Sequence, residues 1–245
     1  MYIIREIDAG LANRLVKRYH YSGKVVSNSI LHLGVFTTDG FLDQLVGCLQ
    51  YGYPINKNST PIKISDDVEM MELNRMVMID SEPRNSESAA IGACNAWLRK
   101  YKKNIKWLLS FSDGKEGNVG YIYQATNWDY IGYILSDSFY DLDGTIMHNI
   151  SVWHKYKENH HDRDSKTTNK ILCDNYKNVS KILSKQHIYI FRLNKYVKLK
   201  FEKQPYPKKD KELCILARHV IKRDGIVLES KEVVTYTDEK LTAVF

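Results

Sequence analysis

The chain has 245 residues, enough for one large domain with an appendage. Hydrophobic residues make up 43% of it and it holds 17 tyrosines, which favours a packed core over disorder. No apolar run approaches the roughly 20 residues of a membrane span, and the four cysteines form no close pair. These features disfavour a membrane protein, a disulfide scaffold and a zinc module. The first residues show no signal-peptide core, and the widely spaced cysteines fit a reduced, cytoplasmic protein with buried thiols.

The net charge of +7 is concentrated in one late block of the chain. Residues 151–211 contain 16 Lys and Arg against 6 Asp and Glu, a net of +10, whereas 1–150 and 212–245 carry −2 and −1. Aromatic residues are interleaved with these cations, as in proteins that bind polyanions. We therefore expect the block, including Lys155 and Lys157, to contact nucleic acid. A lysine-rich solvated surface is the alternative.

Apolar periodicity and turn residues divide the first half of the chain into strands and helices. Asp8 can cap a helix whose apolar residues recur at helical spacing as far as Tyr19. An Asp39-Gly40 turn between two apolar runs predicts a hairpin. The expected elements are a helix after Asp8, strands at 30–37, 45–53 and 69–79, a helix from 83–88 to about 103, a strand at 106–111 and a short helix at 121–125.

In the second half of the chain, the Asp143-Gly144 turn predicts a further hairpin, and the C-terminal part is expected to contain both helices and strands. We expect strands at 131–137 and 145–152, a helix from 168 to about 184, strands at 188–192 and 196–201, a helix at 212–222 and a strand-like run at 226–236. His160, His161 and Asp162 stand together in a polar segment, but no further ligand has fixed helical spacing to them. We expect a solvated loop there and no metal site.

The loop after the first helix carries the first candidate site residues. It reads Tyr19-His20-Tyr21-Ser22-Gly23, and Gly23 is a natural helix stop. His20 and Tyr21 are adjacent aromatic side chains that can take part in proton transfer, which is unusual in a loop. A packed His–Tyr corner is the alternative interpretation.

Two features predict contacts with an anion. Arg75 falls on the apolar face of its strand, where a charge is costly unless it meets a phosphate or a carboxylate. An ion pair with Glu72 or Asp113 is the structural alternative. The next helix opens with Asn85 or Ser86 as its N-cap and Arg84 beside it, and a helix N-terminus with spare N–H groups can hold an anion. The glycines of a Walker loop or a dinucleotide fingerprint are absent.

The stretch from 106 to 133 organises the rest of the chain. A buried strand carries Asp113 at its end, and a glycine-punctuated turn leads into a short helix that contains Tyr123. Open α/β sheets build sites where a strand delivers a carboxylate to a helix mouth. Capping of the next helix is the alternative role of Asp113.

The order of these elements resembles the GNAT acyltransferase fold. In such folds the loop that corresponds to 84–89 holds the pyrophosphate of an acyl-CoA; here Arg84 and Ala89 fit the first and last motif positions, and Glu87 replaces a glycine. The resemblance implies a mostly antiparallel central sheet flanked by helices, an α/β (α+β) class. It would span residues 1–211, with a basic helical insert at 153–187 and a short C-terminal extension at 212–245.

The sequence more closely resembles one branch of this fold, the bacteriophage Mom DNA-modification proteins. The residues that carry it are Tyr19-His20-Tyr21-Ser22, Leu73-Asn74-Arg75, Asn85-Ser86-Glu87-Ser88, Ser112-Asp113, Gly120-Tyr121-Ile122-Tyr123-Gln124-Ala125-Thr126-Asn127-Trp128 and the late Pro205-Tyr206-Pro207-Lys208. This branch implies conversion of adenine N6 in duplex DNA to a carbamoylmethyl derivative, which protects phage DNA from restriction. The fold implies an acyl-CoA, such as acetyl-CoA, as donor, although simple acetyl transfer does not give that product.

The resemblance assigns roles to the candidate residues. Asp113 would accept an N6 proton, Tyr123 would protonate the leaving group, and His20 with Tyr21 would stack on the base or share proton transfer. The donor-binding residues would be Arg75, Arg84, Asn85, Ser86 and Ser88. The DNA-binding residues would be Ser22, Asn127 and Trp128, and the basic block, which lies outside the resemblance, would add Lys155 and Lys157 through its charge. A generic GNAT enzyme that acylates a protein or small-molecule amine, and a non-enzymatic DNA-binding anti-restriction protein, are the alternatives.

Overall fold

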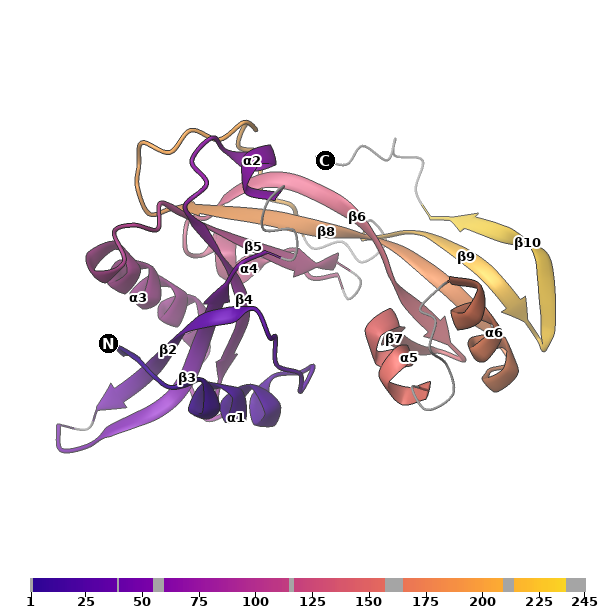
Figure 1. The fold of residues 1–245 in the computed structure, drawn as a ribbon, viewed down its shortest axis with the longest axis horizontal. Helices are drawn as coiled ribbons and strands as arrows, with labels where there is room; N and C mark the ends of the chain where they lie inside the picture. The colour runs from indigo at the N-terminus through magenta and orange to yellow at the C-terminus, as the bar shows by residue number, and fades with distance from the viewer. Residues whose placement is uncertain are drawn as a thin grey trace.

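A computed structural model describes residues 2–38, 40–54, 60–114, 117–156, 165–208 and 214–236. The described chain is a mixed α+β fold built on one open, largely antiparallel sheet (Figure 1). Its helices are α1 Ala9–Tyr19, α2 Thr60–Ile64, α3 Ser86–Tyr101, α4 Tyr121–Gln124, α5 Asn149–Tyr156 and α6 Ser165–Asn175. Its strands are β1 Ile3–Glu6, β2 Ser29–Thr38, β3 Asp43–Gly52, β4 Met70–Met78, β5 Trp107–Asp113, β6 Asp129–Leu142, β7 Thr145–His148, β8 Val179–Arg192, β9 Ile215–Arg223 and β10 Ile226–Thr235.

The sheet runs in the order β1-β2-β3-β4-β5-β8-β6-β7, and β9 and β10 extend it from β8. Among the described strands only β4 and β5 pair in parallel. A parallel pair needs a crossover connection, and α3 supplies it. This topology places the two central strands β4 and β5 under α3.

Helices cover both faces of the first part of the sheet. The face toward α3 holds the largest core cluster, in which Ile91 and Leu98 pack against strand residues such as Leu49. On the opposite face Ala12 and Val16 of α1 pack against β3 and β4. The Asp8 side chain accepts a hydrogen bond from the Leu11 N–H at 2.9 Å, so the predicted cap of this helix is confirmed.

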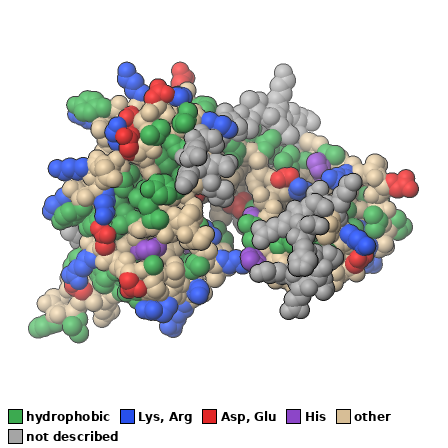
Figure 2. Space-filling view, viewed as in Figure 1, with side chains coloured by type: hydrophobic (Ala, Val, Ile, Leu, Met, Phe, Trp, Pro, Cys, Tyr) green, Lys and Arg blue, Asp and Glu red, His purple; other side chains and the backbone are tan. Residues whose placement is uncertain are grey.

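The molecule has two lobes joined by the long strands β6 and β8 (Figure 1). The first lobe contains α1 to α4 and β1 to β5. The second lobe contains α5, α6, β7, β9, β10 and the distal parts of β6 and β8, and it has its own core around Tyr140, Leu172 and Val179. A hollow separates the lobes in the space-filling view (Figure 2).

Most predicted elements of the first 150 residues are confirmed, and the errors fall mainly in the later part. Residues 179–184, predicted to end a helix, belong to β8, so the predicted basic insert at 153–187 is helical only in part. Residues 215–222 of the predicted tail helix belong to β9. Residues 196–201 form only an isolated bridge, between Leu199 and Ser65, instead of a strand. The prediction also missed β1 and α2, and it assigned residues 149–152 to a strand where α5 begins.

Long-range pairing explains these errors. The apolar spacing of residues 172–183 suits a helix, yet β8 is held by β6 on one side and by β5 and β9 on the other. Local propensity is a weak signal against three such pairings. His160, His161, Asp162 and Lys157 lie outside the described residues. The division at residue 211 stays a prediction, although β9 and β10 continue the same sheet.

Candidate active site

The site forms where β4 and β5 separate. The two strands pair only between Met70–Glu72 and Trp107–Leu109, and then diverge as β4 continues to Met78 and β5 to Asp113. A β-bulge sets the start of this opening, because β3 pairs Gln50 with Arg75 but Tyr51 with Leu73. Bulges re-aim side chains next to active sites, and this one falls at Asn74.

A cavity of about 690 Å³ lies at the opening. It brings together five residues that the sequence indicated separately: His20, Tyr21, Arg75, Asp113 and Tyr123. The second lobe adds Phe139 of β6 and His148 of β7 to the wall. The structure therefore places these five candidate residues around one cavity, whereas Arg84, Asn85, Ser86 and Ser88 do not line it, and the roles of all of them stay predictions.

Tyr123 is a buried acid in this cavity. Its side chain belongs to α4, is 8% exposed, and its hydroxyl lies 2.7 Å from the Ser110 hydroxyl of β5. Burial raises the pKa of Tyr123 to about 12, so the phenol is protonated at neutral pH. The phenol therefore carries a proton that it can donate, and it is a weaker acid than a solvent-exposed tyrosine.

His20 is neutral and has a defined tautomer. Burial, and then the charge of Arg75, lower the pKa of His20 to about 4. The Ser22 N–H donates to His20 Nδ1 at 3.1 Å, which places the proton of the neutral ring on Nε2. His20 therefore offers a hydrogen-bond donor. Tyr21 stacks on its ring at 4.3 Å and is 91% exposed.

Arg75 is held by the backbone. Its Nε donates to the Lys24 carbonyl at 3.0 Å and its Nη1 to the Asn74 carbonyl at 2.7 Å. A guanidinium has five N–H donors, so three are left for other groups. Burial lowers the pKa of Arg75 from its usual value. In the described part of the chain this side chain is fixed by carbonyl groups rather than by an ion pair.

Glu72 is a cavity residue that the sequence analysis considered only as an ion-pair partner. It lines the same cavity as Asp113, and burial raises its pKa to about 7, while Asn74 and Arg75 act in the opposite direction. A carboxyl that titrates near neutral pH is suited to accept a proton. The signal was its position in the apolar run of β4, three residues before Arg75.

The start of α3 fits an anion less well than predicted. Asn85 occupies the N-cap in the left-handed conformation, with φ 69°, and makes no side-chain cap bond. A hollow of about 490 Å³ beside it is lined by Arg84 but also by Asp80, Glu82 and Glu87. Three carboxylates against one guanidinium disfavour a pyrophosphate at this loop.

The other two predicted donor-binding residues at the start of α3, Ser86 and Ser88, form hydrogen bonds with neighbouring residues. Ser88 Oγ donates to the Asn85 carbonyl at 3.0 Å. Ser86 is buried, and its hydroxyl lies 3.4 Å from the Glu87 carboxylate. Both hydroxyl groups therefore contact other residues of the first turn of α3.

The predicted DNA-binding residues fall in different places. Trp128 is fully buried and packs on Tyr123 with ring centroids 5.2 Å apart, so it supports the site from within the core. Asn127, with φ 58°, lines a separate groove along α3. Ser22 contacts His20, and Lys155 donates to the Tyr176 hydroxyl at 2.7 Å in the second lobe. Lys157 lies outside the described residues.

The sequence matches a known protein family and one curated relative. Residues 1–208 match the Mom protein family. The methylcarbamoylase mom of Escherichia phage Mu is 42% identical over 151 residues, which cover 61% of this chain and 61% of the relative. The chain thus aligns with less than two thirds of that curated relative's length.

Solved structures with a similar arrangement are N-acetyltransferases. The ribosomal-protein-S18-alanine N-acetyltransferase of Escherichia coli has a TM-score of 0.41 at 8% identity, covering 79% of this chain and 95% of its own. A GNAT family acetyltransferase of Elizabethkingia anophelis, with acetyl-CoA bound, has a TM-score of 0.40 at 10% identity, covering 78% and 97%. No helix in the described ranges is long and apolar enough to cross a membrane.

Proposed function

The chain belongs to the Mom protein family, and we propose that it is a transferase that modifies adenine N6 in duplex DNA by a carbamoylmethylation-like reaction. The observation that carries the proposal is the cavity that joins the protonated phenol of Tyr123, the carboxyl groups of Glu72 and Asp113, and the half-buried guanidinium of Arg75. The name of the phage Mu relative, a methylcarbamoylase, supports the class of reaction. The protein would act in the bacterial cytoplasm and protect phage DNA from restriction.

The cavity supplies the proton transfers that an exocyclic amine needs. The amine is a poor nucleophile because its lone pair is delocalised into the ring, so a carboxylate, Asp113 or Glu72, accepts one N6 proton. A bond forms from N6 to a carbon of the donor while the bond from that carbon to its leaving group breaks. Tyr123 gives its proton to the leaving group. Arg75 stabilises the negative charge that develops on the donor.

The target atom is hidden inside a duplex, so the adenine must leave the stack. Tyr21 is exposed at the cavity mouth and already stacked on His20, and aromatic side chains hold flipped bases by stacking. His20 Nε2–H can donate to an acceptor on the base edge. Flipping costs a few kcal/mol, which contacts with the phosphate backbone offset.

An acyl-CoA-type molecule is the donor class that the fold resemblance implies, and the residues at the start of α3 fit its pyrophosphate poorly. Asp80, Glu82 and Glu87 share that hollow with Arg84. The steps above therefore depend only on residues of the cavity and on a donor with a leaving group that accepts a proton.

Mass spectrometry of host DNA tests the proposed function. The chain is expressed in bacteria, and the DNA is digested to nucleosides. We expect a new modified deoxyadenosine whose mass identifies the transferred group. Tyr123→Phe, with expression matched to the unchanged protein, should reduce its amount at least about 100-fold, the usual contribution of an acid or base, and so should whichever of Asp113→Asn and Glu72→Gln removes the base. Unmodified DNA from well-expressed, folded protein would contradict the proposal.

A further inference from the structure

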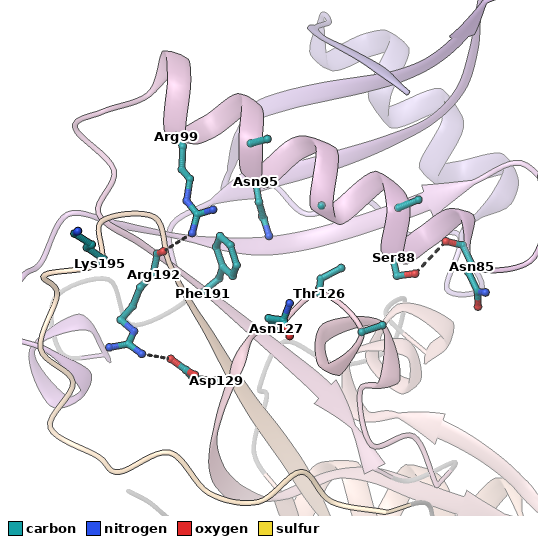
Figure 3. Close-up of a pocket in the computed structure, with 14 residues that line it drawn as sticks. Asn85, Ser88, Asn95, Arg99, Thr126, Asn127, Asp129, Phe191, Arg192 and Lys195 are labelled. Carbon is teal, nitrogen blue, oxygen red and sulfur yellow. Dashed lines mark hydrogen bonds and ion pairs between the residues drawn. The ribbon is translucent and has the colours of Figure 1, made fainter. Parts of the chain in front are cut away.

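A second cavity, of about 810 Å³, runs along α3 (Figure 3). One wall is α3, from Asn85 to Arg99. The other wall is formed by residues 125–129, after α4, and by residues 191–195, at the end of β8. The proposed reaction uses none of the residues at the far end of this groove.

Small residues open α3 toward the groove. Ser88, Ala89, Gly92 and Ala96 all line it. A Cβ atom added at Gly92 would meet no atom within 4 Å. The groove is therefore accessible to a ligand along more than two helical turns.

Asn95 is a buried polar side chain that faces the groove. It is 2% exposed, and neither its amide nitrogen nor its amide oxygen has a hydrogen-bond partner among the residues that the structure describes. Figure 3 shows its amide directed from α3 toward Thr126 and Asn127. An unpaired buried amide is costly to the fold, so its presence at a groove points to a ligand that pairs with it.

The far end of the groove is cationic. Arg99 and Lys195 line it, and neither forms an ion pair in the described ranges. The Arg99 guanidinium lies 4.7 Å from the Phe191 ring centre and donates to the Arg192 carbonyl at 3.2 Å, which fixes its position.

The one carboxylate of the groove is already neutralised. Asp129 pairs with Arg192 at 2.8 Å and with Lys203 at 3.0 Å. The charge at this end is thus clearly positive, in contrast with the three carboxylates beside Arg84 at the start of α3.

We propose that the α3 groove binds a nucleotide, with its phosphate at Arg99 and Lys195 and the polar edge of its base at Asn95. An asparagine amide can donate to and accept from adjacent groups on a base edge, and the guanidinium and ammonium groups suit a phosphate. The nucleotide is either the distal end of the group donor or a separate molecule. Its binding does not depend on the proposed DNA modification.

Calorimetry with the full-length protein tests the site. The probes are AMP, adenosine without phosphate, and inorganic pyrophosphate. We expect AMP to bind at least 10-fold more tightly than either of the other two, since only AMP offers both groups. Absence of AMP binding, or pyrophosphate binding as tight as that of AMP, would overturn the assignment.

Variants in the groove separate this site from the main cavity. Gly92→Phe fills the open space and Arg99→Gln removes the exposed cation, and each should weaken AMP binding at least 10-fold, while Gly92→Ala changes it less than twofold. Asn95→Leu should lose AMP binding and melt at a higher temperature, because an unpaired amide is removed. Unchanged AMP binding in Gly92→Phe and Arg99→Gln would sink the proposal.

Measuring modified deoxyadenosine in the host DNA of cells that express folded Gly92→Phe shows whether the nucleotide is part of the group donor or a separate ligand. Loss of modified deoxyadenosine identifies the nucleotide as part of the donor, and its retention identifies a separate ligand. If AMP binds as expected and the unchanged protein modifies no DNA, the groove assignment stands and the proposed function fails.

Discussion

Glu72 and Asp113 are two of the four carboxylate residues that line the reaction cavity, with Asp80 and Glu87, and pH tests the role of Glu72. Because burial raises the pKa of Glu72 to about 7, this group is protonated below neutral pH and becomes a proton acceptor only above it. If Glu72 is the base, DNA modification by the unchanged protein rises with pH through about 7.

Glu72→Gln should abolish that rise and lower the rate by roughly 100-fold or more. Asp113→Asn is the matched control, since it removes a carboxylate from the same cavity and should leave the inflection near pH 7 in whatever rate remains. The measurement is the initial rate of deoxyadenosine modification between pH 5.5 and 8.5. An inflection near pH 7 that persists in Glu72→Gln would assign it to another group.

At the scale of elements, the sequence could indicate His20, Tyr21, Arg75, Asp113 and Tyr123, but neither Glu72 nor the geometry that joins these residues. His20 and Tyr21 lie just before a helix stop, Gly23, while Arg75 interrupts an apolar face and Asp113 ends a buried strand. These are local signals. The separation of β4 from β5 and the bulge at Asn74 arise from pairing between distant strands, which no local pattern encodes.

The dependence on distant strand pairing also explains why Glu72 was not predicted as a site residue and why the first part of β8 was predicted as a helix. Glu72 looks like an ordinary strand residue, and only the surrounding fold gives it a pKa near neutrality. The helix predicted to reach residue 184 follows a real apolar periodicity as far as Asn175, where α6 ends. Beyond it, pairing with β6 and β9 decides the conformation. The groove at Asn95 had no signal beyond an amide on the buried stripe of a helix.

The bulge at Asn74 depends on close backbone packing at Gly52. A Cβ at Gly52 would overlap the Asn28 carbonyl oxygen and approach Asn74 Oδ1 to 2.6 Å. Gly52→Ala should therefore destabilise the protein by roughly 1–3 kcal/mol, as overpacking does. It should also reduce DNA modification, because the neighbouring Arg75 and Glu72 would shift.

Gly92→Ala is the matched substitution on α3. A Cβ there meets open space, and alanine is the better helix former by about 0.5–1 kcal/mol, so this variant should be as stable as the unchanged protein or more so. Urea unfolding of the two variants provides the comparison. Equal stability of Gly52→Ala and Gly92→Ala would mean that the backbone near Gly52 moves to accommodate the added methyl group.

For the whole molecule, the distribution of free cations matters more than the net charge of +7. Several cations of the late block have carboxylate partners: Lys181 pairs with Asp137 at 2.6 Å and Lys200 with Asp66 at 2.8 Å. By contrast, Lys17 and Arg18 are exposed at the end of α1, directly before His20 and Tyr21. Lys and Arg side chains gather at the lower edge of the first lobe, over α1 (Figure 2).

This arrangement predicts that α1 shares duplex binding with the late block. Each phosphate contact contributes about 0.9 to the slope of log affinity against log salt, so the unchanged protein should bind duplex DNA with a steep dependence between 50 and 200 mM salt. Lys17→Gln with Arg18→Gln should reduce the slope by about 2. Lys181→Gln with Lys200→Gln removes the same charge from paired positions and should have a smaller effect.

Fluorescence anisotropy with a labelled duplex measures both slopes. A flat salt dependence of the unchanged protein would exclude backbone contacts as the energy source for base flipping. Equal losses in the two double variants would show that net charge alone governs binding. A larger loss in the α1 pair would place the duplex against the end of α1, where Tyr21 can reach a flipped adenine and the cavity behind it can act on N6.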